Sequence, residues 1–146
     1  MAESNSFKSL RNLLVEELTP LLSPEETFIQ LFHKEAVMEF PYAPEDGVSH
    51  ITGEKEMREY FAQVGDLLEI DEMILDQKYI SSDQKTAILE FHCTGRLIPT
   101  GHDYNQKYIS VISISNGKIT RYKDYWNPDV IRKALGNEWG DTLRNP

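Results

Sequence analysis

The spacing of hydrophobic positions predicts helices at the start of the chain. Apolar side chains recur at helical intervals from Phe7 to Leu18, and Pro20 ends this run. A second helix is predicted to begin directly afterwards, because Ser23-Pro24-Glu25-Glu26 has the form of a capping box with proline at the first helical position. The apolar positions 28, 29, 31 and 32 would supply the buried face of that helix.

A short strand and a third helix follow. The segment "AVMEF", residues 36–40, is typical of a strand, and the two prolines after it indicate a loop that runs to about residue 52. From Gly53 onward, Met57, Phe61 and Val64 stand at i, i+4 and i+7. This spacing places them on one face of a helix.

From about residue 72, apolar residues no longer recur at helical spacing but at every second position. Alternation of this kind predicts strands over 72–80, 85–94, 104–114 and 118–126. The last two strands are separated by Asn116-Gly117, which indicates a tight hairpin, because a type I′ turn needs positive φ at both central residues. The chain from 72 to 126 is therefore expected to form an antiparallel sheet.

This order of elements predicts an α+β fold. The N-terminal helices are expected to pack in the concave face of a curved, mainly antiparallel sheet, giving a cone-shaped α+β barrel with a pocket at its open end. A single domain over residues 7–133 is expected, followed by a C-terminal tail over 134–146.

Composition and charge narrow the possible partners. The chain has 146 residues, of which 40% are hydrophobic, and this suits one domain with a real core. Its formal charge of -9 disfavours nucleic acids and anionic membrane surfaces as partners. No apolar run approaches the roughly 20 residues of a membrane helix, and the single cysteine, Cys93, fits a reducing compartment, so a cytoplasmic protein is expected.

The most unusual chemistry lies in the last predicted strand, "ITRYKDYWNPD". Alternation places Thr120, Tyr122, Asp124 and Trp126 on one side, the side expected to be buried, and Ile119 on the other. A carboxylate between two aromatic residues in an apolar pocket loses hydration, so the pKa of Asp124 should rise. Asp124 could then exchange protons near neutral pH as a general acid or base.

Two alternatives remain open for these polar and aromatic residues. Asp124 could instead accept a hydrogen bond from Tyr104, Tyr42 or an arginine and serve only to orient another group. The aromatic side chains could stack on a flat ligand or simply fill the core. The four histidines lack the spacing of a metal site, so no metal or cofactor is expected.

Three phrases, "LFHKEAVMEFPYAP", "ITGEKEMREYF" and "NGKITRYKDYWNP", resemble the ketosteroid isomerase superfamily, which also includes nuclear transport factor two. Within it, "FPYAP" and the last phrase look most like the SnoaL-like polyketide cyclases and the phenazine-biosynthesis A/B proteins. The resemblance implies the cone-shaped fold and a homodimer formed through the outer sheet face. Fold alone does not settle the reaction.

The catalytic groups of ketosteroid isomerase, an aspartate base with a tyrosine and a neutral aspartic acid as oxyanion donors, do not carry across. The position of the base is Phe40, and that of the neutral acid is Ser110, or Ile109 in an ungapped alignment. The position of the tyrosine falls near Glu16 or Leu13. By contrast, Asp124 replaces a small apolar residue of the isomerases, as acidic residues do in the cyclase and phenazine branches.

The expected function is that of a SnoaL-like small-molecule enzyme, in which Asp124 transfers a proton in an isomerase, cyclase or dehydratase type of reaction. The substrate would be a small hydrophobic or aromatic molecule, cyclic or carbonyl-bearing, and Tyr104 or Ser110 could donate to a developing oxyanion. The predicted substrate-binding residues are Phe40, Tyr42, Tyr60, Tyr104, Ser110, Tyr122 and Trp126. The alternative is a non-catalytic ligand-binding or dimerisation domain of the same fold.

Overall fold

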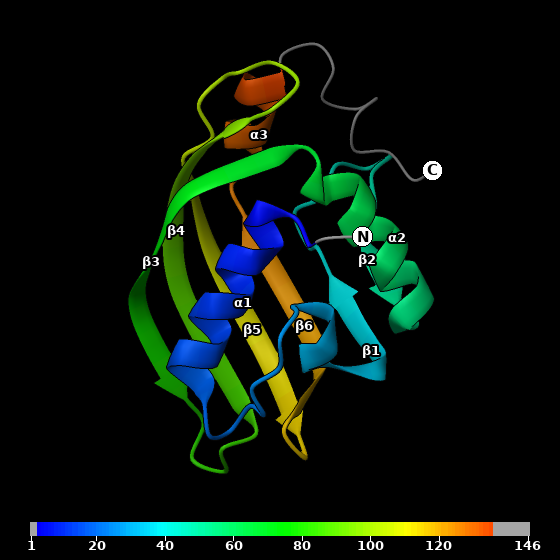
Figure 1. The fold of residues 1–146 in the computed structure, drawn as a ribbon, viewed down its shortest axis with the longest axis vertical. Coiled ribbons are helices and arrows are strands. Elements are labelled where there is room, and N and C mark those ends of the chain that lie inside the picture. The colour runs from blue at the N-terminus through cyan, green and yellow to red at the C-terminus, as the bar shows by residue number, and fades with distance from the viewer. Residues whose placement is uncertain (1–2, 136–146) are drawn as a thin grey trace.

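A computed structural model describes residues 3–135, which form helices and a single curved sheet (Figure 1). In chain order the elements are α1 (Asn5–Leu18), the 3-10 turn η1 (Ile29–Leu31), β1 (Phe32–Glu39), β2 (His50–Thr52), α2 (Gly53–Gly65), β3 (Leu68–Ile80), β4 (Thr86–Leu97), β5 (Gln106–Ser115), β6 (Lys118–Trp126) and α3 (Pro128–Leu135).

The sheet has the strand order β2-β1-β6-β5-β4-β3 and stays open, with β2 and β3 at its edges. Neighbouring strands are antiparallel except β1 and β6, which pair in parallel. In Figure 1 the sheet bends around α1, and α2 lies beside β1 and β2. The predicted α+β fold is therefore confirmed, with helices held in the concave face of a curved, mainly antiparallel sheet.

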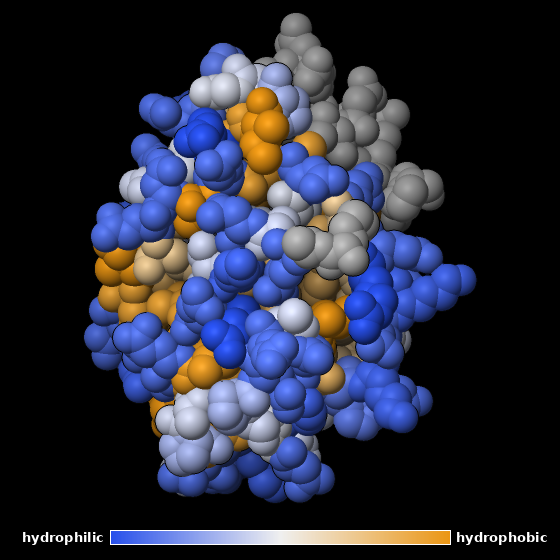
Figure 2. Space-filling view, viewed as in Figure 1, coloured by the Kyte–Doolittle hydropathy of each residue, from blue (hydrophilic) through white to orange (hydrophobic). Residues whose placement is uncertain are grey.

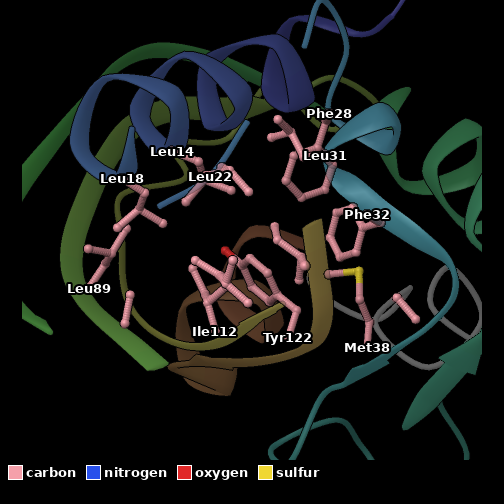
Figure 3. Close-up of a cluster of buried hydrophobic side chains, with 14 of the residues drawn as sticks. Leu14, Leu18, Leu22, Phe28, Leu31, Phe32, Met38, Leu89, Ile112 and Tyr122 are labelled. Carbon is pink, nitrogen blue, oxygen red and sulfur yellow. The ribbon is translucent and has the colours of Figure 1, made fainter. Parts of the chain in front are cut away.

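The core fills the space between α1 and the concave face of the sheet. Leu14 and Leu18 of α1 are buried at helical spacing, and they lie over Leu89 and Ile112 from β4 and β5 (Figure 3). Along β4, buried and more exposed residues alternate as the period of two predicted. No helix within residues 3–135 has both the length and the apolar content to cross a membrane.

The predicted helix after Ser23 is wrong. Its backbone N–H groups bond to distant partners instead: the Ser23 amide donates to the Gly117 carbonyl at 2.9 Å, and the Phe28 amide donates to Oε2 of Glu3 at 2.6 Å. The apolar run needs only η1 to turn Phe28 and Leu31 into the core before β1 begins. Four apolar residues suit such a turn as well as they suit a helix.

Several boundaries also differ from the predicted ones. The strand predicted at 36–40 begins at Phe32, the strand predicted at 72 begins at Leu68, and the loop to residue 52 contains β2. Helix α3, which the sequence did not indicate, follows β6 and ends at Leu135, so residues 136–146 of the predicted tail lie outside the described part. The Asn116-Gly117 turn has φ values of 52° and 79°, as the hairpin prediction required.

The alternation predicted for β6 is interrupted by a bulge. Ile114 pairs with Ile119 whereas Ser113 pairs with Arg121, so Thr120 is an extra residue, and its Oγ1 donates to the Ser113 carbonyl at 3.3 Å. Ile119 is fully buried, and its predicted place on the outer face is wrong. From Tyr122 to Trp126 the strand keeps the predicted phase, with every second side chain directed inward.

The close approach of β3 to β4 at Gly95 yields a stability prediction. A Cβ at this position would lie 2.2 Å from the backbone oxygen of Glu69, so one of the two strands must move. We expect Gly95→Ala to lower the free energy of unfolding by about 2 to 3 kcal/mol in urea titrations. Gly101→Ala is the control, because Gly101 has open space around it and only a positive φ, worth about 1 kcal/mol. Equal losses in the two variants would contradict this interpretation.

Candidate functional site

An aromatic belt crosses the concave face near one end of the sheet. It consists of Phe91, Tyr108, Trp126, Phe40 and Tyr60. Tyr108 of β5 pairs in register with Phe91 of β4 and with Trp126 of β6, and the Phe91 and Tyr108 rings stack at 5.0 Å. Phe40, just after β1, lies 5.4 Å from the Trp126 ring, and Tyr60 of α2 stacks on Phe40 at 4.9 Å. The belt therefore joins the sheet to α2.

Along β6, Asp124 stands two residues before Trp126 of the belt and lies between the belt and the core. Asp124 pairs in register with Ser110, and Tyr122, two residues before it, lies on the same face of the sheet. The Ser110 and Tyr122 hydroxyls bond to each other at 2.7 Å, and both residues are fully buried. On the core side of Asp124, the buried hydroxyl groups are therefore already hydrogen-bonded to each other. On the opposite side, the Asp124 carboxyl faces the aromatic belt.

The belt and Asp124 line a cavity beside α1. Its volume is about 100 Å³, which corresponds to roughly three water molecules at about 30 Å³ each. Among residues 3–135, Asp124 is the single acidic residue in the lining, and no lysine, arginine or histidine is present there. The lining residues are Ser6, Phe7, Leu10, Met38, Phe40, Tyr60, Val64, Leu67, Leu68, Ile70, Met73, Phe91, Leu97, Tyr104, Tyr108, Asp124, Trp126 and Ile131.

Burial in these apolar surroundings raises the pKa of Asp124 to about 8. Within residues 3–135, no backbone or side-chain group donates a hydrogen bond to its carboxyl, and no cation pairs with it. The bond from Tyr104, Tyr42 or an arginine that the sequence left open is therefore not formed. Near neutral pH the carboxyl exists in both protonation states, and its oxygens face the cavity.

The tyrosine hydroxyls at the cavity differ in their partners. The Tyr104 and Tyr108 hydroxyls bond to each other at 2.8 Å. The Tyr60 hydroxyl has no such partner in the described residues. Burial, and next the charge of Asp124, raises the pKa of Tyr60, so this hydroxyl keeps its proton and remains a donor.

The predicted site residues are only partly brought together. Phe40, Tyr60, Tyr104, Asp124 and Trp126 line the cavity. Ser110 and Tyr122 lie behind Asp124 in the core, where their hydroxyls are already paired.

Tyr42 lies away from the cavity. It is 56% exposed, and its ring contacts Tyr125 at 5.5 Å. The chain leaves the sheet after Phe40, and so the next residues are carried outward. Tyr108 also lines the cavity, but it is not among the residues predicted from the sequence. The signal was present, because Tyr108 stands two residues from Ser110 in the alternating pattern of β5 and therefore lies on the same face of the sheet as Ser110.

Among residues 3–135, no three acidic, histidine or cysteine side chains approach closely enough to hold a metal ion. His92 bonds through Nδ1 to Oδ2 of Asp76 at 2.8 Å, and neither residue lines the cavity.

The chain is similar to bacterial proteins, in one case over nearly its whole length. It is 35% identical to the uncharacterized protein YesE of Bacillus subtilis (strain 168), covering 94% of this chain and 95% of the relative. It is 36% identical to an uncharacterized PhzA/B-like protein of Pseudomonas aeruginosa, over 73% of this chain and 74% of the relative.

Solved structures agree with these sequence matches. A crystal structure from Bacillus subtilis, described provisionally as an isomerase, superposes with a TM-score of 0.75 at 35% identity, covering 93% of this chain and 94% of that chain. A SnoaL-like polyketide cyclase structure from Mesorhizobium loti, also provisionally described, has a TM-score of 0.59 at 17% identity, covering 78% of this chain and 97% of that chain, and shows the fold alone. Residues 24–122 match the SnoaL-like domain family, and the chain belongs to that family.

Proposed function

We propose that this protein is a small-molecule enzyme that transfers protons on an uncharged carbonyl compound, with Asp124 as the proton carrier. The observation that carries the proposal is a carboxyl group without a partner among the described residues, with a pKa raised to about 8, facing an apolar cavity. A general acid or base works best when its pKa lies near the working pH. The provisional description of the Bacillus subtilis structure as an isomerase supports the same class of chemistry.

The chemistry can be written with the groups present. Ionised Asp124 removes a proton from the carbon next to a carbonyl group, the C–H electron pair forms a C=C bond, and the carbonyl oxygen takes the negative charge. Protonated Asp124 then returns the proton to another carbon of the substrate. Isomerisation needs only these steps, whereas a dehydration would use the same proton to release hydroxide as water. Neither reaction needs an oxidant or a reductant.

Cavity size and charge restrict the substrate. A cavity of about 100 Å³ is smaller than the cavity of about 150 Å³ that holds benzene, so it suits a molecule with at most one small ring and not a fused-ring compound. A carboxylate or phosphate group would lie near Asp124, and the described part of the lining has no lysine, arginine or histidine to balance its charge. A neutral, mainly apolar ketone fits both limits.

The alternative is a non-catalytic domain that binds a ligand of the same kind. Its support is that Phe40 and Ser110 stand where ketosteroid isomerase has acidic groups, and that Ser110 is committed to Tyr122. In that case Asp124 would contribute to affinity and not to turnover.

We also propose a cytoplasmic homodimer that forms through the outer face of the sheet. Ile74 and Ile109 are exposed there, at 40% and 44%, although large apolar side chains favour burial. Across the β4–β5 pair, Ile109 stands beside Glu90 and Lys107 stands beside His92, so the face mixes apolar and charged groups. A two-fold contact would cover the apolar side chains while the charged groups form a rim.

Asp124→Asn tests catalysis directly. With cyclohex-3-en-1-one as the probe, its isomerisation to the conjugated ketone is followed by ultraviolet absorbance. We expect kcat/KM to fall by about a thousandfold, while the affinity for cyclohexanone changes by less than about threefold. Asp71→Asn is the control, because the Asp71 side chain is 63% exposed and outside the cavity. Unchanged turnover would overturn the role of Asp124, and equal loss of turnover and affinity would favour the binding domain.

The raised pKa of Asp124 also predicts a pH-dependent stability. Below about pH 4 both the folded and the unfolded chain hold the proton, so Asp124 imposes no cost; the cost grows as pH rises and is complete above the folded pKa of about 8. We expect the gain in free energy of unfolding on Asp124→Asn to be about 4 to 5 kcal/mol larger at pH 9 than at pH 4.5. Urea titrations at the two pH values measure it, with Asp71→Asn as control. Gains that stay equal at the two values would contradict burial of the carboxyl.

The dimer is tested by Ile109→Lys. A charge at this position would be buried by the proposed contact, so sedimentation velocity should show a dimer for the wild type and a monomer for the variant. Ile98→Lys is the matched control, because Ile98 is equally exposed, at 52%, but follows the end of β4. A monomeric wild type, or a dimeric Ile109→Lys variant, would rule out this interface.

A further inference from the structure

We infer that the hydroxyl group of Tyr60 binds the carbonyl oxygen of the substrate, on the α2 side of the cavity, while Asp124 acts from β6. The part of this inference that concerns proton transfer rests on the proposed function, whereas the binding of a neutral ketone by Tyr60 does not. Tyr60 thereby becomes the group that selects a carbonyl compound.

The ring of Tyr60 is held on two sides. It stacks on Phe40 at 4.9 Å with an interplanar angle of 27°, and it contacts Phe61 edge-on at 6.3 Å. These contacts fix the plane of the ring and so the direction of its hydroxyl group. A donor that is already oriented loses little entropy when it binds a ligand.

Tyr60 is also the available donor of the cavity. Of the other hydroxyl-bearing residues in the lining, Ser6 bonds to Ser4 at 3.3 Å, and Tyr104 and Tyr108 bond to each other at 2.8 Å. The Nε1 group of Trp126 has no partner either, but it is buried away from accessible space, so an acceptor reaches it only if the indole moves. In the part of the chain that the structure describes, Tyr60 alone among the lining hydroxyl groups is both accessible and without a partner.

The electrostatics of the pair suit an enolate. The Asp124 carboxyl lies close enough to raise the pKa of Tyr60, after the larger effect of burial. The hydroxyl therefore stays protonated when Asp124 is ionised, and it can donate to the oxygen on which negative charge develops. A fixed donor in an apolar cavity stabilises such charge more strongly than water does.

Together the two groups define a substrate class. The ligand is a neutral ketone of about one six-membered ring, with its oxygen on Tyr60 and an acidic C–H bond toward Asp124. During the reaction the proton moves from carbon to Asp124 and back to carbon, and Tyr60 keeps its own proton throughout. The charge on oxygen appears and disappears within the Tyr60 hydrogen bond.

The infrared carbonyl band of bound ¹³C-cyclohexanone tests this contact without turnover. The probe is added to wild type, Tyr60→Phe and Tyr79→Phe, the last being the control because Tyr79 is 49% exposed and outside the cavity. We expect a band at lower frequency in wild type and Tyr79→Phe, and loss of that shift with about tenfold weaker binding in Tyr60→Phe. For cyclohex-3-en-1-one, Tyr60→Phe should lower kcat/KM by about a hundredfold.

The outcomes separate this inference from the proposed function. A shifted band that survives in Tyr60→Phe, or a wild type that does not bind cyclohexanone, overturns it. A Tyr60-dependent band in the Asp124→Asn variant, with no turnover by wild type, supports the binding contact and contradicts catalysis. If Tyr60→Phe fails to fold, 3-fluorotyrosine at position 60 gives the same test, because the more acidic hydroxyl should lower the band further.

Discussion

The phase of β6 is the constraint on which the site depends. In a strand without a bulge, an inward Ile119 would turn Arg121, Lys123 and Tyr125 toward the core. The extra residue at Thr120 allows both Ile119 and Tyr122 to be buried, and every second residue after Tyr122 then faces the concave side. Asp124 is placed in the cavity by this backbone feature and not by a contact of its own carboxyl.

The surroundings of that position explain its unusual ionisation. On the core side, the paired hydroxyls of Ser110 and Tyr122 satisfy each other and leave no donor for Asp124. On the open side, the aromatic belt limits access of water. A carboxyl between a satisfied core and an aromatic wall loses hydration without a compensating bond, and the direction of its pKa shift follows from this.

Much of this arrangement could be predicted from local patterns. Alternation with a period of two predicts the strands, and helical spacing predicts α1 and α2. The letters "YKDYW" also predict that Tyr122, Asp124 and Trp126 face inward. The structure of the segment after Ser23 could not be predicted in this way, because its amides bond to Gly117 and Glu3, which are distant in sequence. Local propensity carries no information about such long-range hydrogen bonds.

The same limit applies to the binding residues. Sequence alone named Ser110 and Tyr104 as candidate donors but could not show that Tyr122 and Tyr108 already occupy their hydroxyls. Whether a polar side chain is available depends on its partners, which come from other strands and helices. Tyr60 differs from the other candidates only in lacking such a partner within the described chain, and a tertiary structure is needed to see this.

Stability alone gives no reason for an acidic residue at position 124. The backbone of β6 pairs with β5 whichever side chain stands there, and the core is already complete at Tyr122. An unpaired carboxyl that has lost hydration opposes folding at every pH above its unfolded pKa, whereas an apolar residue would not. The energetic cost of Asp124 is therefore best understood together with the cavity it faces, because a group that gains and loses a proton near pH 8 is useful only where a ligand can meet it.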